Sequence, residues 1–176
     1  MTNRVFVAGV GMTRFTTPNQ GELYTQIGPR AVREALADAG LSYDNIGQAF
    51  VGHVFGDSTS GQRVLYEIGM SGVPIVNVNN NCSSGATALF LARQAVAAGM
   101  TDCALALGFE QMQRGALGRQ FANHPGPLDR FVEMTDRLVG YDRNGVMAAQ
   151  LFGGAAVEYA RKYRSEEHTS ELQSPI

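Results

Sequence analysis

The residue with the clearest chemical potential is Cys82, which lies in the segment Asn79–Gly85, of sequence NNNCSSG. A strand-like apolar run, Pro74–Val78, leads into it, and a helical pattern over Ser83–Ala98 follows it. A thiol at a helix N-terminus faces unpaired N–H groups and the positive end of the helix dipole, which favour the reactive thiolate. The same N–H groups can stabilise an oxyanion on a thioester carbonyl. The pattern therefore predicts an acyl-accepting nucleophile, and position alone leaves a buried structural cysteine as the alternative.

Four other features could carry chemistry, and each has a simpler interpretation. His53 lies within an apolar run and is interpreted as a packed, hydrogen-bonded core histidine. Cys103 opens a strand-like run and is assigned to the core, while Glu110 ends that strand and either supports a site or caps backbone groups. Gly9–Gly11 follows a strand-like run but lacks the third glycine of a dinucleotide-binding loop. No metal-ligand cluster and no paired-carboxylate site stands out.

The elements that must position Cys82 alternate between strand and helix patterns. The expected strands are Val5–Val10, Ala49–Phe55, Pro74–Val78 and Cys103–Leu107. Helical spacing covers Ala31–Ala39, where Pro29 suits a first turn and Gly40 a C-terminal stop. Further helices are expected at Gln62–Met70, Ser83–Ala98 and about 145–163. This alternation predicts an α/β fold in which a mostly parallel sheet is covered by helices on both faces.

The predicted helix after Cys82 is apolar on every side, and Arg93 is its only charged residue. A helix of this kind is expected to be buried at the centre of a larger structure.

Composition limits the class of protein. Of the 176 residues, 44% are hydrophobic and 17% are charged, and the formal net charge is −2. These values favour a soluble globular domain and argue against a general nucleic-acid binder. No apolar run approaches the length of a membrane span, and the N-terminus has no signal-peptide pattern, so a cytoplasmic location is expected, or a peroxisomal or mitochondrial matrix in a eukaryote. The helix between Cys82 and Cys103 separates them too widely for a disulfide.

The final segment, residues 164–176, differs from the amphipathic pattern before it. It is polar and aperiodic, and it resembles the translation of a common sequencing-adapter oligonucleotide. We therefore expect a non-native tail at the end of a truncated gene, with a disordered natural terminus as the alternative, and exclude the tail from fold reasoning.

Several motifs together resemble the sterol-carrier-protein type of thiolase. They are Gly61–Tyr66, Gly72–Asn77, Asn79–Gly85 and Ala104–Glu110, within a similarity that extends from residue 4 to 163. The resemblance implies a thiolase fold, transfer of acyl groups to and from coenzyme A, and Cys82 as the residue that forms the acyl-enzyme thioester. It also implies a homodimer, with acyl-CoA and coenzyme A as substrates and no prosthetic cofactor or metal.

The same resemblance predicts that the chain is incomplete. A thiolase needs a histidine and a second cysteine from G-H-P and C-x-G motifs in a carboxy-terminal half, and neither motif is present. His124, followed by Pro125, superficially resembles the first but falls in a variable excursion over about 111–141, expected to cover the acyl-CoA site. Residues 1–163 would thus form the thiolase amino-terminal domain, poorly soluble and inactive alone. The resemblance implies that a second, similar half packs on the apolar helix after Cys82, so this helix is expected to be exposed without that half.

Two alternatives to a truncated thiolase stay open. One is a non-catalytic lipid or acyl-CoA transfer protein, which would keep its ligand affinity without Cys82. The other is a ketosynthase-like condensing enzyme, which would prefer an acyl-carrier-protein substrate. Chain length and branching of the acyl group are not encoded in any recognisable motif.

Overall fold

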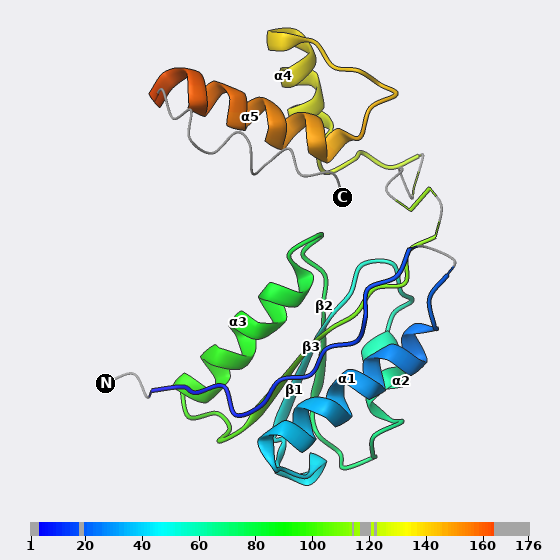
Figure 1. Ribbon diagram of the computed structural model, residues 1–176, viewed down its shortest axis with the longest axis vertical. Helices are drawn as coiled ribbons and strands as arrows, with labels where there is room; N and C mark the ends of the chain where they lie inside the picture. The colour runs from blue at the N-terminus through cyan, green and yellow to red at the C-terminus, as the bar shows by residue number, and fades with distance from the viewer. Residues whose placement is uncertain (1–3, 18–19, 114, 117–120, 122, 164–176) are drawn as a thin grey trace. The chain divides into compact units, whose positions relative to one another are not determined.

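The computed structural model describes residues 4–17, 20–113, 115–116, 121 and 123–163. The chain forms two compact units, Met1–Gly118 and Arg119–Ile176. The first contains α1 (Tyr24–Ala39), a 3₁₀ turn η1 (Tyr43–Asn45), β1 (Gln48–Gly52), α2 (Ser60–Leu65), β2 (Ile75–Val78), α3 (Ser84–Ala97) and β3 (Ala104–Gly108). The second contains α4 (Asp129–Val139) and α5 (Met147–Tyr163) (Figure 1). Within the described ranges, none of these helices combines the length and apolar character that crossing a membrane requires.

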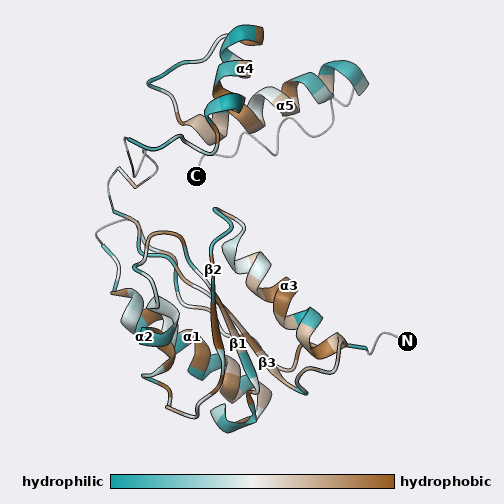
Figure 2. Cartoon of the chain, turned by 180° about the vertical axis from the view of Figure 1, so that it is seen from behind, coloured by the Kyte–Doolittle hydropathy of each residue, from teal (hydrophilic) through white to brown (hydrophobic). Residues whose placement is uncertain are grey.

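The sheet of the first unit is parallel, with strand order β2-β1-β3. Alternate residues of β1 face opposite sides: Ala49 and Val51 pack in a core with α1 and α2, whereas Phe50 packs against the small residues of α3. Figures 1 and 2 show the largely hydrophobic strands between α1 and α2 on one face and α3 on the other. This arrangement confirms the predicted α/β fold with helices on both faces of a parallel sheet.

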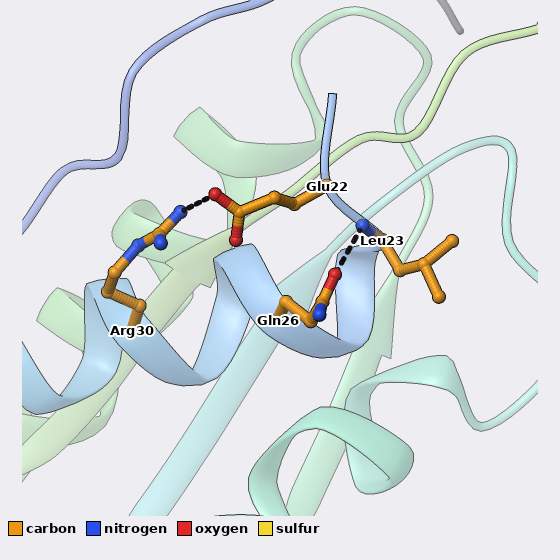
Figure 3. Close-up of polar contacts among 4 residues, drawn as sticks. All are labelled: Glu22, Leu23, Gln26 and Arg30. Carbon is orange, nitrogen blue, oxygen red and sulfur yellow. Dashed lines mark hydrogen bonds and ion pairs between the residues drawn. The ribbon is translucent and has the colours of Figure 1, made fainter. Parts of the chain in front are cut away.

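The N-terminus of α1 lies earlier than the sequence predicted. The Gln26 side-chain oxygen accepts a hydrogen bond from the Leu23 N–H at 3.1 Å, and Arg30 pairs with Glu22 at 3.0 Å (Figure 3). These contacts extend the helix by several residues, so Pro29 is buried inside it and not in its first turn. The predicted stop is confirmed, because Gly40 adopts a left-handed φ of 64° directly after the helix.

The strand predicted at Val5–Val10 is wrong, because in the described part of the chain this segment pairs with no strand. It lies against α1 instead, and the Val10 N–H donates to Asp38 Oδ2 at 2.9 Å. A Cβ at Gly9 would lie 2.5 Å from an α1 carbonyl oxygen, and one at Gly11 would be closer still. The two glycines therefore let the backbone approach the helix, which a strand-like pattern does not reveal.

Helix α3 is covered on one side only. Its buried side is a row at helical spacing, Ser84, Ala88, Ala92 and Ala95. Away from this row, Leu89 is 58% exposed and Phe90 is 54% exposed. The expected exposure of this apolar helix is therefore confirmed, since the described residues cover only the stripe of small side chains that packs on the sheet.

The second unit contains the long helix that the sequence predicted near its end. Helix α4 lies within residues 111–141, and α5 begins two residues after the predicted start near 145. Neither helix has a buried residue, although the two helices contact each other. The predicted foreign tail, 164–176, lies outside the described residues.

Candidate acyl-transfer site

Cys82 lies in the turn between β2 and α3, two residues before the first helical residue. Its side chain is exposed, so the thiol is open to a reagent or substrate. The preceding residue, Asn81, has a φ of 50°, a left-handed conformation that asparagine tolerates better than most residues. The predicted junction of strand, turn, cysteine and helix is therefore present.

Four hydrogen bonds hold this turn to the first turn of α3. The Asn80 N–H donates to Ser84 Oγ at 2.8 Å, and the Ser84 hydroxyl donates to the Asn81 carbonyl at 2.7 Å. The Asn80 side-chain amide donates to Thr87 Oγ at 2.9 Å, and the Thr87 hydroxyl donates to the Ser83 carbonyl at 2.9 Å. Because Ser84 is only 4% exposed, its bonds are shielded from water and fix the backbone on both sides of Cys82.

Three glycines let the strand–helix junction at Cys82, called the elbow below, pack closely on the end of the sheet. Gly52, the last residue of β1, pairs in register with Val78 of β2 and with Gly108 of β3. A Cβ at Gly52 would lie 2.5 Å from the Ser84 carbonyl carbon and 2.7 Å from the Gly85 nitrogen. A Cβ at Gly108 would lie 3.3 Å from the Gly85 Cα. The first turn of α3 therefore sits directly on the carboxyl ends of β1 and β3, at the edge where α/β sheets bind ligands.

The thiol itself has one weak polar neighbour, Asn81 Oδ1 at 3.9 Å. No histidine of the first unit's described residues hydrogen-bonds to it, because the histidine there, His53, bonds to Asn77. His124 lies in the second unit, where its ring stacks on Phe121 at 5.3 Å. Within the described residues of the first unit, no histidine therefore contacts the Cys82 thiol through a hydrogen bond.

His53 follows β1 and does not lie inside the strand, because β1 ends at Gly52. The ring is 8% exposed and stacks on Phe109 with centroids 5.2 Å apart, and its Nε2 lies 3.2 Å from Asn77 Oδ1. The interpretation as a packed, hydrogen-bonded histidine is confirmed. Asn77 was missed by sequence reasoning, although a polar residue in an otherwise apolar strand was the available signal.

Two further candidates resolve into structural roles. The Glu110 carboxylate accepts the N–H groups of Val54 and Phe55 at 2.9 and 3.0 Å, so it caps the backbone that leaves β1. Cys103 is free and partly buried, packs against the core beneath α1, and is not bonded to Cys82. Among residues 4–17, 20–113, 115–116, 121 and 123–163, no group of three or more His, Cys, Asp or Glu side chains could hold a metal.

A cavity of about 1210 Å³ lies in the first unit, and its described lining does not include Cys82. Its walls are the segment 4–17, α1, α3 and the stretch from Asp102 to Gln113, which includes β3. Apolar side chains such as Leu89, Val96, Leu105 and Leu107 contribute to the lining. The cavity is therefore large enough for a long aliphatic chain.

Comparison with known proteins identifies the family. Residues 5–170 match the family described as "Thiolase, N-terminal domain". The chain belongs to the thiolase family. "Sterol carrier protein 2" of Bos taurus is 45% identical over 175 residues, which cover 98% of this chain and 32% of that protein. "Benzoylsuccinyl-CoA thiolase subunit BbsB" of Thauera aromatica is 36% identical over 112 residues, which cover 62% of this chain and 29% of that protein.

A solved structure described as "Ltp2-ChsH2(DUF35) aldolase" aligns with a TM-score of 0.60 at 22% identity, over 90% of this chain and 38% of that one. The likeness supports the thiolase fold. This thiolase-family chain spans about a third of the length of the curated relatives it matches. The family match extends to residue 170, so the foreign origin of residues 164–176 stays a prediction.

Proposed function

We propose that this thiolase-family chain carries the nucleophile of an acyl-CoA acyltransferase. One observation carries the proposal: Cys82 is an exposed thiol held by a shielded hydrogen-bond network at a strand–helix junction, in a chain of the thiolase family. Enzymes of many folds place their acyl-accepting nucleophile on such an elbow. The relative from Thauera aromatica, named as a thiolase of a CoA thioester, supports the substrate class.

The proposed reaction is thiolysis of a 3-ketoacyl-CoA. The Cys82 sulfur attacks the 3-keto carbon, the bond between C2 and C3 breaks, and its electron pair on C2 accepts a proton, which releases acetyl-CoA. The sulfur of free coenzyme A then attacks the acyl-cysteine thioester, transfers the acyl group and restores the Cys82 thiol. Coenzyme A is a substrate in this scheme, and no resident prosthetic group or metal takes part.

The base and the second proton-transferring cysteine are proposed to lie outside this chain, in a carboxy-terminal half of the complete protein. That protein is also proposed to be a homodimer. Both proposals derive from the family resemblance, and the absence of a histidine bonded to Cys82 in the described first unit is compatible with the first.

The test is covalent labelling. The protein is incubated with acetyl-CoA or acetoacetyl-CoA, quenched in acid, and digested for peptide mass spectrometry. We expect one acyl group on the Cys82 peptide, none in Cys82→Ala, and normal labelling in Cys103→Ser, the matched control. Labelling that never reaches Cys82 in the complete protein would exclude the thioester mechanism. Labelling only from an acyl-carrier-protein thioester would favour the condensing-enzyme alternative.

A second candidate is a non-catalytic carrier of lipids or acyl-CoA. The observation that favours it is the cavity of about 1210 Å³ in the first unit. The name of the relative from Bos taurus, "Sterol carrier protein 2", supports the same candidate. A fluorescent fatty acid that binds equally to the wild type and Cys82→Ala, with no acyl transfer in the complete protein, would select this candidate.

A further inference from the structure

His53 follows the last residue of β1, and its ring packs on Phe109, which follows the last residue of β3. The ring stacks nearly parallel on Phe109, with an interplanar angle of 9°, and Phe109 stacks on Tyr24 at 5.3 Å. This stack joins residues from the start of α1, the end of β1 and the end of β3. The position and plane of the His53 ring are therefore fixed.

The polar contacts of His53 assign its tautomer. Asn77 Oδ1 lies 3.2 Å from His53 Nε2 and accepts the Gly61 N–H at 2.8 Å. The orientation of this amide is fixed because its nitrogen donates to Gln62 Oε1 at 2.6 Å. An amide oxygen only accepts, so Nε2 carries the proton. The other ring nitrogen, Nδ1, is buried and has no partner among the described residues.

These contacts hold the last two residues of β2 from both sides. Asn77 is bound to His53 and to two residues of α2, and the His53 backbone N–H donates to the Val78 carbonyl at 3.1 Å. The turn that carries Cys82 leaves β2 directly after Val78. The contact between His53 and Asn77 therefore lies at the end of β2, one residue before the strand passes into that turn.

We propose that His53 and Asn77 are positioning residues for Cys82, acting through the end of β2. A buried polar pair is not needed for stability, because apolar residues of similar shape serve a core as well or better. In this proposal the pair holds the end of β2 against the segment that leaves β1, beyond the last paired residues, Gly52 and Val78. Its relevance to acyl transfer rests on the function proposed above, whereas its effect on the thiol does not.

The structure supplies a variant that separates positioning from folding. His53→Phe keeps an aromatic ring for the stack with Phe109 and removes the Nε2 donor. It leaves Asn77 Oδ1 satisfied by the Gly61 N–H and also removes the unpartnered Nδ1. Its urea midpoint should therefore stay close to the wild-type value. His53→Gln is the matched variant, because it restores a side-chain donor without the ring.

The readout is the alkylation rate of Cys82 by iodoacetamide in the 176-residue chain between pH 6 and 9. Peptide mass spectrometry separates Cys82 from Cys103, which serves as an internal reference. We expect His53→Phe to slow Cys82 alkylation about threefold to tenfold at pH 7, since a displaced turn changes the surroundings of the thiol. His53→Gln should stay within about twofold of the wild type, and Cys103 should not change.

Two outcomes would overturn the proposal. One is an unchanged rate and pH profile for Cys82 in His53→Phe. The other is an equal loss in His53→Phe and His53→Gln that follows a lowered urea midpoint, because that pattern assigns the pair to stability alone. Alkylation needs no acyl-CoA, so failure of Cys82 to accept an acyl group in the labelling test would reject the proposed function without affecting this result.

Discussion

Replacing Gly52 by alanine tests whether the elbow rests on backbone contact with the sheet. The new Cβ would lie 2.5 Å from the Ser84 carbonyl carbon and 2.7 Å from the Gly85 nitrogen, both backbone atoms of the first turn of α3. Real Cβ atoms essentially never approach closer than 3.0 Å, so the helix start must retreat by about 0.5 Å or more. Overpacking of this kind costs roughly 1–3 kcal/mol. The same displacement would disturb the hydrogen bonds that Ser84 makes on both sides of Cys82.

The assay is urea unfolding monitored by circular dichroism, with Cys82 alkylation measured in parallel. Gly85→Ala is the matched control, because its Cβ would meet only the Gly108 Cα at 3.7 Å, an ordinary contact, and alanine is the better helix former by up to about 1 kcal/mol. We expect Gly52→Ala to lower the free energy of unfolding and Gly85→Ala to leave it unchanged or raise it. Equal stabilities for Gly52→Ala and the wild type would refute the close packing of α3 on β1.

Three further predictions follow from the same structure and sequence. Burial, and secondarily Tyr66, raises the pKa of Tyr43, so the wild type should lose stability as the pH rises above about 10, the ordinary tyrosine pKa, and through the raised pKa of the folded state. Tyr43→Phe should show no such loss when urea unfolding is compared at pH 8 and pH 11. An equal loss of stability in the wild type and in Tyr43→Phe would contradict this assignment. Glu110→Ala leaves the N–H groups of Val54 and Phe55 without their acceptor and should lower the free energy of unfolding, measured in urea, by roughly 1–3 kcal/mol. Glu110→Gln keeps an acceptor and should lower it by less. Equal losses in the two variants would argue against the capping role. Re-sequencing the source locus across the codon for Tyr163 should reveal a reading frame that continues into a second half with G-H-P and C-x-G motifs. A stop codon directly after Ile176 would instead support the carrier candidate.

Most of the fold of the first unit could be predicted from local pattern. The strands at 48–52, 75–78 and 104–108, the helix at 84–97 and the part of α1 from residue 31 to residue 39 all fall on expected apolar runs or helical periods. These elements bury apolar residues at the spacing of their own geometry, so short-range pattern is sufficient to find them. Boundaries were less accurate: α2 ends at Leu65 although the helical pattern continues to Met70.

The sequence does not reveal which neighbour an element packs against, because hydrophobic periodicity describes the element alone. Val5–Val10 has the composition of a strand, yet Gly9 and Gly11 allow it to lie against α1, and nothing in the segment itself specifies that neighbour. The apolar character of α3 indicates that the helix needs covering neighbours, but only contacts with other elements determine which of its sides are covered.

The sequence by itself determined that Cys82 stands at a strand–helix junction, because both flanking elements are encoded within about twenty neighbouring residues. The tertiary structure decided what surrounds that cysteine. His53 and Asn77 are 24 positions apart in sequence, and Gly52 lies 32 positions before Ser84, so their contacts exist only once β1, β2 and α3 are packed together. Local preferences act over one or two helical turns, whereas the geometry of the site depends on close packing between elements that are remote in the chain.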